Sequence, residues 1–233
     1  MKRFRELIAA IRTAYPADGF FAEFEKNIRV AARRKAYRYY NDALMLLDDE
    51  SWKILKAKAV EQYGNEREGQ TKQPFFNQLN EAFAYRYLLR RKFTNIRFLE
   101  EGKKRTPDIR FFDQERELYC EVKSIGISQD EIKRRNGGVH DGRVYLNVNE
   151  GLINKLKSDI DGARKQIQSV GKDGIVFMAV RFDDWVLHHY ENYRKQLIEF
   201  CRSGGYKDVV IKVLPMYVRR LGLIDCTRMK SIP

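Results

Sequence analysis

The spacing of the apolar residues changes once along this chain of 233 residues, and that change limits the folds that it can adopt. Up to about residue 92, apolar side chains recur every three or four positions, which is typical of helices. Beyond it, alternating or short continuous apolar runs indicate strands, separated by amphipathic helical segments. The predicted elements of this second part are, in order, strands at 96–98, 108–112 and 117–124, a helix at 152–167, a strand at 175–180, a helix at 185–201 and a strand at 209–214.

This order predicts an α/β fold with a mixed central sheet flanked by helices and preceded by a helical N-terminal region. The stretch from Gly64 to Pro74 has almost no apolar residue and is predicted to be a linker. We therefore expect a helical region over 1–70, the α/β domain over 71–215 and a C-terminal tail over 216–233.

Two helices can be predicted in more detail. Ser51 is expected to cap a helix that ends near Gly64. Residues 75–92 are expected to form one helix, with Phe83 on its apolar face and Glu81 off that face.

Composition and charge limit the class of protein. Apolar residues make up 43% of the chain, too many for a disordered protein, and none of the apolar runs approaches the ~18 residues of a membrane span. The net charge of +13 is spread along the chain, which favours a polyanionic partner such as nucleic acid. The three cysteines lie far apart without a Cys-x-x-Cys pair, and the N-terminal apolar run is too short for a signal peptide. We therefore expect no disulfide framework and a cytoplasmic protein.

The candidate chemistry lies between Thr106 and Gly126. In the predicted strand 117–124, alternation places Glu121 and Lys123 on one face. If the preceding strand pairs with it through a two-residue or four-residue loop, Asp108 lies directly opposite Glu121. A three-residue loop would shift the register by one and separate the two acids.

Two facing carboxylates destabilise a sheet unless a cation neutralises them. A hard divalent ion such as Mg²⁺ is held by one or two carboxylates together with phosphate oxygens and water. Such an ion would polarise a phosphate and acidify a bound water, while Lys123 would orient that water or neutralise charge on the phosphorus centre. Glu81 is a further acid for the shell of this ion or for a second ion.

Pro107-Asp108, followed after a thirteen-residue step by Glu121-Val122-Lys123, resembles the motif of the PD-(D/E)xK, or restriction-endonuclease-like, nuclease superfamily. The similarity covers about residues 72–215 and includes the order of the elements and the upstream acid Glu81. It implies a restriction-endonuclease-like core and a Mg²⁺-dependent endonuclease, with Mn²⁺ able to substitute, that leaves 5′-phosphate ends.

The resemblance also implies roles for particular residues. Metal binding falls to Asp108, Glu121, the Val122 carbonyl and Glu81, and Lys123 acts on the attacking water. The helix that follows the motif is expected to add an auxiliary side chain, for which Gln166 and Lys157 are the candidates.

Basic residues in two places are expected to contact nucleic acid. These are Lys133, Arg134, Arg135 and Arg143 in a polar loop over 126–146, and Arg29 and Arg33 in the N-terminal region. A solvated helix face is the alternative interpretation of the latter two. DNA is favoured over RNA, and cutting two strands with one site per chain favours a homodimer.

Three classes of function stay open. The first is the endonuclease, and the second is a nucleic-acid-binding module, or a subunit of a larger DNA-processing complex, on the same fold without turnover. The third is an interaction protein whose basic surface docks on an acidic partner. Asp108 could also be a turn residue after Pro107, and Glu121 with Lys123 a solvated strand face. The chain contains no Gly-x4-Gly-Lys, Gly-x-Ser-x-Gly or His-Glu-x-x-His motif, which argues against a built-in nucleotide motor, serine hydrolase or zinc protease.

Overall fold

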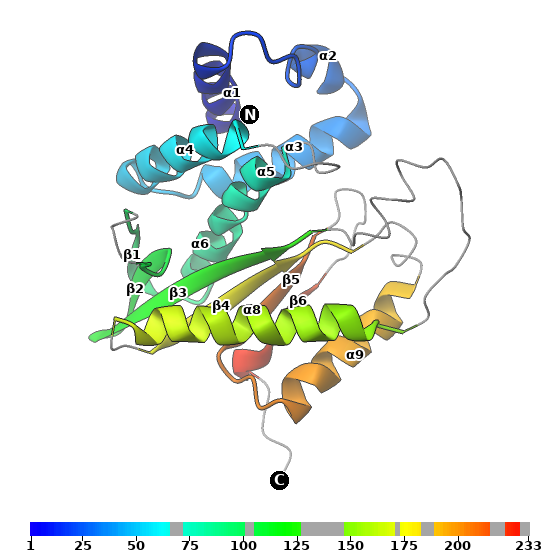
Figure 1. The fold of residues 1–233 in the computed structure, drawn as a ribbon. Coiled ribbons are helices and arrows are strands. Elements are labelled where there is room, and N and C mark those ends of the chain that lie inside the picture. The colour runs from blue at the N-terminus through cyan, green and yellow to red at the C-terminus, as the bar shows by residue number, and fades with distance from the viewer. Residues whose placement is uncertain are drawn as a thin grey trace. The chain divides into compact units, whose positions relative to one another are not determined.

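The computed structural model divides into two compact units, each built from two separate stretches of the chain (Figure 1). Unit 1 comprises Met1–Glu100 and Ile109–Arg116, and unit 2 comprises Glu101–Asp108 and Glu117–Pro233. The structure describes residues 1–65, 72–100, 105–126, 147–170, 173–182, 189–214 and 222–228.

Strands in the described part of the chain form one six-stranded sheet with the order β1-β2-β3-β4-β5-β6. The pairs β3–β4 and β4–β5 are parallel, whereas β1–β2 and β5–β6 are antiparallel. This confirms the predicted α/β class with a mixed sheet. The strands are β1 (Thr94–Phe98), β2 (Ile109–Asp113), β3 (Arg116–Ile125), β4 (Gly174–Val180), β5 (Val209–Val213) and β6 (Leu223–Asp225).

The helices of unit 1 enclose a core rich in aromatic rings. Phe4 packs against Phe21 and Phe24, and Tyr63 packs against Phe21 and Phe75. All five side chains are buried, so the predicted helical N-terminal region has a real core. Its helices are α1 (Lys2–Ala14), α2 (Phe24–Asn27), α3 (Ala31–Leu44), α4 (Asp49–Tyr63), α5 (Gln73–Leu79) and α6 (Glu81–Arg90).

The start of α4 corrects the predicted cap. Asp48, not Ser51, is the N-cap, and its side chain accepts a hydrogen bond from the Ser51 backbone N–H at 3.0 Å. Ser51 instead supplies the capped N–H and a hydroxyl that donates to Asp48 at 2.8 Å. The predicted end of this helix is confirmed, because Gly64 is its C-cap.

The predicted single helix over 75–92 is two helices, α5 and α6, that meet at Asn80. The first begins at Gln73 with Pro74 in its first turn, so the predicted linker ends earlier than Pro74. Pro is favoured there because its missing N–H is not needed at a helix start. Six of the ten residues of α6 besides Glu81 are buried, which explains why a one-sided apolar pattern did not mark the break.

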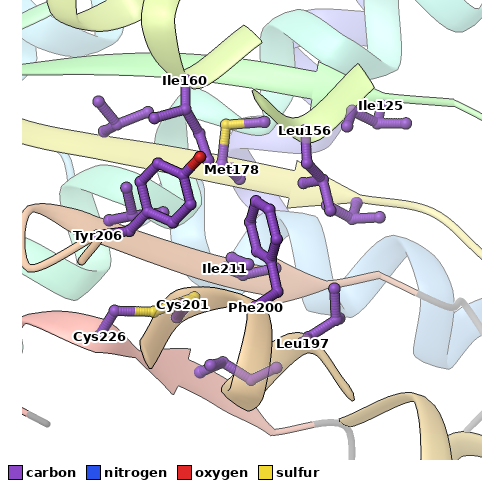
Figure 2. Close-up of a cluster of buried hydrophobic side chains, with 14 of the residues drawn as sticks. Ile125, Leu156, Ile160, Met178, Leu197, Phe200, Cys201, Tyr206, Ile211 and Cys226 are labelled. Carbon is purple, nitrogen blue, oxygen red and sulfur yellow. A yellow bond between two sulfur atoms is a disulfide. The ribbon is translucent and has the colours of Figure 1, made fainter. Parts of the chain in front are cut away.

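In unit 2, α8 (Glu150–Gln168) and α9 (Tyr190–Ser203) pack on the same face of the parallel strands. Leu156 from α8 and Phe200 from α9 lie over Met178 and Ile211 of β4 and β5 (Figure 2). Asn149 caps α8 by accepting a hydrogen bond from the Leu152 N–H at 2.7 Å. The apolar period predicted for 152–167 is therefore the sheet-facing side of α8.

The end of the described chain differs from the predictions. Leu223–Asp225 is a strand, β6, that pairs with β5 and is followed by the short 3-10 helix Cys226–Arg228. A three-residue strand is too short to show a period in sequence. Contrary to expectation, Cys201 and Cys226 are joined in a disulfide, because α9 and the 3-10 helix after β6 bring together two residues 25 positions apart (Figure 2). Cys120 is buried and is not part of this disulfide.

None of the helices in the described ranges has the length and hydropathy that a membrane span requires.

Candidate active site

The connection between β2 and β3 has the length that the site requires. β2 ends at Asp113 and β3 begins at Arg116, so the loop consists of Gln114 and Glu115. Gln114 has φ +57°, the left-handed conformation typical of two-residue hairpin loops. The three-residue loop that would have separated the two acids is therefore not the one formed.

The register of β3 against β4 fixes the face on which the candidate side chains lie. Glu121 pairs with Val176 and Lys123 with Met178. Val176 and Met178 belong to the core beneath α8, and residues paired across parallel strands share a face. Glu121 and Lys123 therefore lie on the α8 side of β3, which is the common face that their alternation predicted.

Asp108 is held beside β3 by a backbone hydrogen bond. The Val122 N–H donates to Asp108 Oδ2 at 2.7 Å. This bond fixes the carboxylate next to Glu121, near enough for its negative charge to raise the pKa of Glu121. The two acids that the hairpin argument placed opposite one another are thus neighbours.

Glu121 is the most unusual acid of this group. It is only 2% exposed, and its Oε1 accepts a hydrogen bond from Lys123 Nζ at 2.6 Å. Among the described residues, no donor reaches its Oε2, although that atom is buried. Burial and the charge of Asp108 raise the pKa of Glu121 to about 8, against the opposing effect of Lys123. A buried carboxylate oxygen without a donor is costly unless a further partner binds it.

Lys123 is held between Glu121 and the end of α8. Its Nζ donates to Gln166 Oε1 at 3.4 Å, and Gln166 Nε2 donates to the Thr106 carbonyl at 2.6 Å. Gln166 therefore ties α8 both to Lys123 and to the segment that leads into Asp108. Of the two auxiliary candidates, Gln166 is the one in contact with the group, whereas Lys157 is exposed on α8. The Thr106 carbonyl was not predicted, since a backbone acceptor leaves no signal in residue identity.

The donor set suits a small hard cation. Asp108 and Glu121 offer two neighbouring carboxylates, and one or two carboxylates are what Mg²⁺ usually takes from a protein. Within the described ranges, no group of three or more His, Cys, Asp or Glu side chains is placed to hold a metal ion. The buried Oε2 of Glu121 is the atom that a cation would satisfy.

The other predicted site residues belong to unit 1 or lie outside the residues that the structure describes. Glu81 belongs to unit 1, where it is buried and accepts a hydrogen bond from Gln78 Nε2. Arg29 and Arg33 are exposed near the start of α3. The loop residues Lys133, Arg134, Arg135 and Arg143 lie outside the described residues.

Comparison with protein-family models, with curated proteins and with solved structures finds no match for this chain. The resemblance to PD-(D/E)xK nucleases therefore stays a prediction, resting on the residues and on their arrangement.

Proposed function

We propose that this protein is a divalent-metal-dependent nuclease that hydrolyses phosphodiester bonds of DNA, built on a restriction-endonuclease-like core. One observation carries the proposal. Glu121 Oε2 is buried beside a second carboxylate, Asp108, with no donor from the residues that the structure describes, and the same strand supplies a lysine, Lys123. An ordinary solvated strand face would not bury an acid in this way.

In this proposal Asp108, Glu121 and the Val122 carbonyl hold Mg²⁺, or Mn²⁺ in its place. When bound, the ion would supply a Lewis acid for the phosphate and a lower pKa for a coordinated water.

Lys123 is proposed to orient the attacking water and to offset negative charge that develops on the phosphate. It is already fixed by Glu121 on one side and by Gln166 on the other, so little reorganisation is needed when substrate binds. Gln166 acts as a positioning residue, because its second hydrogen bond fixes the segment that carries Asp108. The Val122 N–H holds the Asp108 carboxylate in its orientation.

Nicking of supercoiled plasmid DNA in Mg²⁺ and in Mn²⁺ tests the proposal. Wild type is compared with Asp108→Ala and Lys123→Ala, and Lys165→Ala serves as a matched control because it removes an exposed lysine from α8. We expect wild type and the control to nick DNA, both site variants to be inactive, and EDTA to stop the reaction.

Nicking that persists in both site variants would contradict the proposed site. Binding to DNA in EDTA, with no cleavage in either metal by any protein, would favour the non-catalytic nucleic-acid-binding module instead.

A further inference from the structure

A basic face in unit 1 has no role in the proposed chemistry. It consists of Arg29 in the turn before α3 and of Arg33, Arg34, Lys35 and Arg38 on α3, and we call it the α3 basic face. We infer that the α3 basic face is a surface that binds the phosphate backbone of DNA. This inference rests on the proposed function for the choice of DNA as the polyanion.

The first evidence is exposure. Every residue from 29 to 35 is exposed, and the buried side of α3 begins only at Ala36. The first turn of α3 is therefore in contact with solvent around its whole circumference. An amphipathic helix normally buries one side from its first turn, so packing within unit 1 does not explain this segment.

The second observation concerns the acidic partners of the cations in the α3 basic face. Arg33 donates to the neutral Asn27 side chain, and Arg38 lies 3.8 Å from Asp42. Within the described part of the chain, no carboxylate lies within ion-pairing distance of Arg29, Arg34 or Lys35, and the first turn of α3 contains no acid. The positive charge of this face is therefore available to a partner.

The third observation is that the positive charges of the α3 basic face weaken helix α3 in the unbound protein. Arg34 and Arg38 are like charges four residues apart, which repel one another on a helix. Cations in a first turn also oppose the helix dipole, which favours acids there. These arrangements weaken the isolated helix, and a polyanion bound along the face would remove both penalties.

The chemistry of the face favours a phosphate backbone over a membrane. Four of its five cations are arginines, whose planar guanidinium groups bind phosphate oxygens in pairs. Arg34 and Arg38 are separated by a rise of about 6 Å along the helix, a spacing that allows each to reach a different phosphate. Membrane-surface helices need several large apolar side chains to insert, whereas Val30 is the one large apolar residue between 29 and 35.

Equilibrium binding to a fluorescently labelled DNA duplex, measured by anisotropy in EDTA over a series of salt concentrations, tests the inference. The triple variant Arg29→Gln, Arg34→Gln, Lys35→Gln is compared with the matched control Lys2→Gln, Lys53→Gln, Arg90→Gln, which removes three exposed charges elsewhere in unit 1. We expect the triple variant to bind at least about tenfold more weakly, and its log–log salt slope to fall by about 2 to 3. The control should keep the wild-type slope.

A second variant separates binding from folding. Arg34→Glu puts an acid into the first turn of α3, where it favours the helix. We expect its melting temperature to equal or exceed that of wild type while DNA binding weakens. Loss of stability together with binding would assign Arg34 a structural role and overturn its place in the interface.

The remaining outcomes are distinct. Equal weakening in the triple variant and its control would reduce the effect to net charge, and unchanged binding would overturn the inference outright. Binding to phosphatidylserine vesicles but not to DNA would assign the face to a membrane surface. If the wild-type protein cleaves DNA and the triple variant binds DNA as tightly as wild type, only this inference is refuted. If the protein binds DNA through the α3 basic face but does not cleave it, only the proposed function is refuted.

Discussion

Asp48 in unit 1 and Glu121 in unit 2 are both anchored by neighbouring side chains, yet their pKa values move in opposite directions. Burial alone would raise the pKa of Asp48, but hydrogen bonds from Ser51 and Tyr85 and the charge of Arg97 outweigh it and lower that pKa to about 2. For Glu121, burial and Asp108 act together and raise the pKa to about 8.

The difference lies in how many donors each acid meets. Asp48 accepts from Tyr85 at 2.9 Å and lies 2.8 Å from Arg97, in addition to both bonds from Ser51. It therefore links the start of α4 to α6 and β1 within unit 1. Within the described part of the chain, Glu121 accepts from Lys123 and has an acid, Asp108, as its neighbour. An acid whose oxygens all accept hydrogen bonds stabilises the fold. A buried acid with an oxygen that accepts none is typical of sites that bind a ligand or a metal ion.

The largest expected contrast is in activity. Glu121→Gln should lower plasmid nicking at least about 100-fold, because an amide cannot replace the charge of a metal-binding carboxylate. Asp48→Asn should keep wild-type nicking at temperatures where it is folded. Initial nicking rates at saturating Mg²⁺ measure both, and an active Glu121→Gln protein would contradict the assigned role of Glu121.

The next contrast is in stability. Asp48→Ala should lower the free energy of unfolding by about 2 kcal/mol, because α4 loses its cap and Tyr85 and Arg97 lose their acceptor. Urea titration followed by circular dichroism measures the change. Ser203→Ala is a control on an exposed helix end, for which we expect a change below about 0.5 kcal/mol.

The surroundings of Glu121 and of Asp48 could be predicted from the sequence only where the contacting residues lie close together along the chain. Alternation within one strand and one short loop placed Asp108, Glu121 and Lys123 together, because all the information was local. The choice of Gln166 over Lys157 could not be made, since it depends on how α8 lies on the sheet. Tertiary contacts of the same kind buried Glu81 on the side of α6 that was predicted to face away from the core.

The misses have the same cause. Asp48 and Ser51 are both good capping residues three positions apart, and only the tertiary partners of Asp48 decide between them. The disulfide depends on β6, a strand of three residues that pairs with β5. Neither could be derived from residue spacing.

A smaller effect tests the comparison with matched substitutions. Changing each acid to its amide should shift stability in opposite directions when measured in EDTA. At pH ~9, above the folded pKa of about 8, Glu121→Gln should raise the free energy of unfolding by about 1 kcal/mol, because it removes a buried charge and its repulsion from Asp108. Asp48→Asn should lower it by about 1 kcal/mol, since charge-assisted hydrogen bonds are lost. Shifts of the same sign in both proteins would refute the contrast.

The smallest effect is in the pH dependence. The folded pKa of Asp48 lies near 2, below the ordinary value of 3.8, so the unfolded chain binds more protons between these two values. The contribution of Asp48 is therefore complete above pH ~4 and is lost as pH falls toward ~2. Asp48→Asn should flatten this acid limb of the stability curve without abolishing it. Asp18 also contributes to this limb, because hydrogen bonds from Lys72 and Tyr63 outweigh its burial and lower its pKa to about 2. An unchanged acid limb would contradict the assignment.

The path of the chain between the two units has a practical consequence. The chain crosses from one unit to the other after Glu100, after Asp108 and after Arg116. No single cut can therefore give both units whole. A cut after Glu100 takes β2 from unit 1, and a cut after Arg116 takes Glu101–Asp108 from unit 2. Separately expressed halves would have to reassociate before both units are complete, so cleavage and binding are best assayed together on the uninterrupted chain.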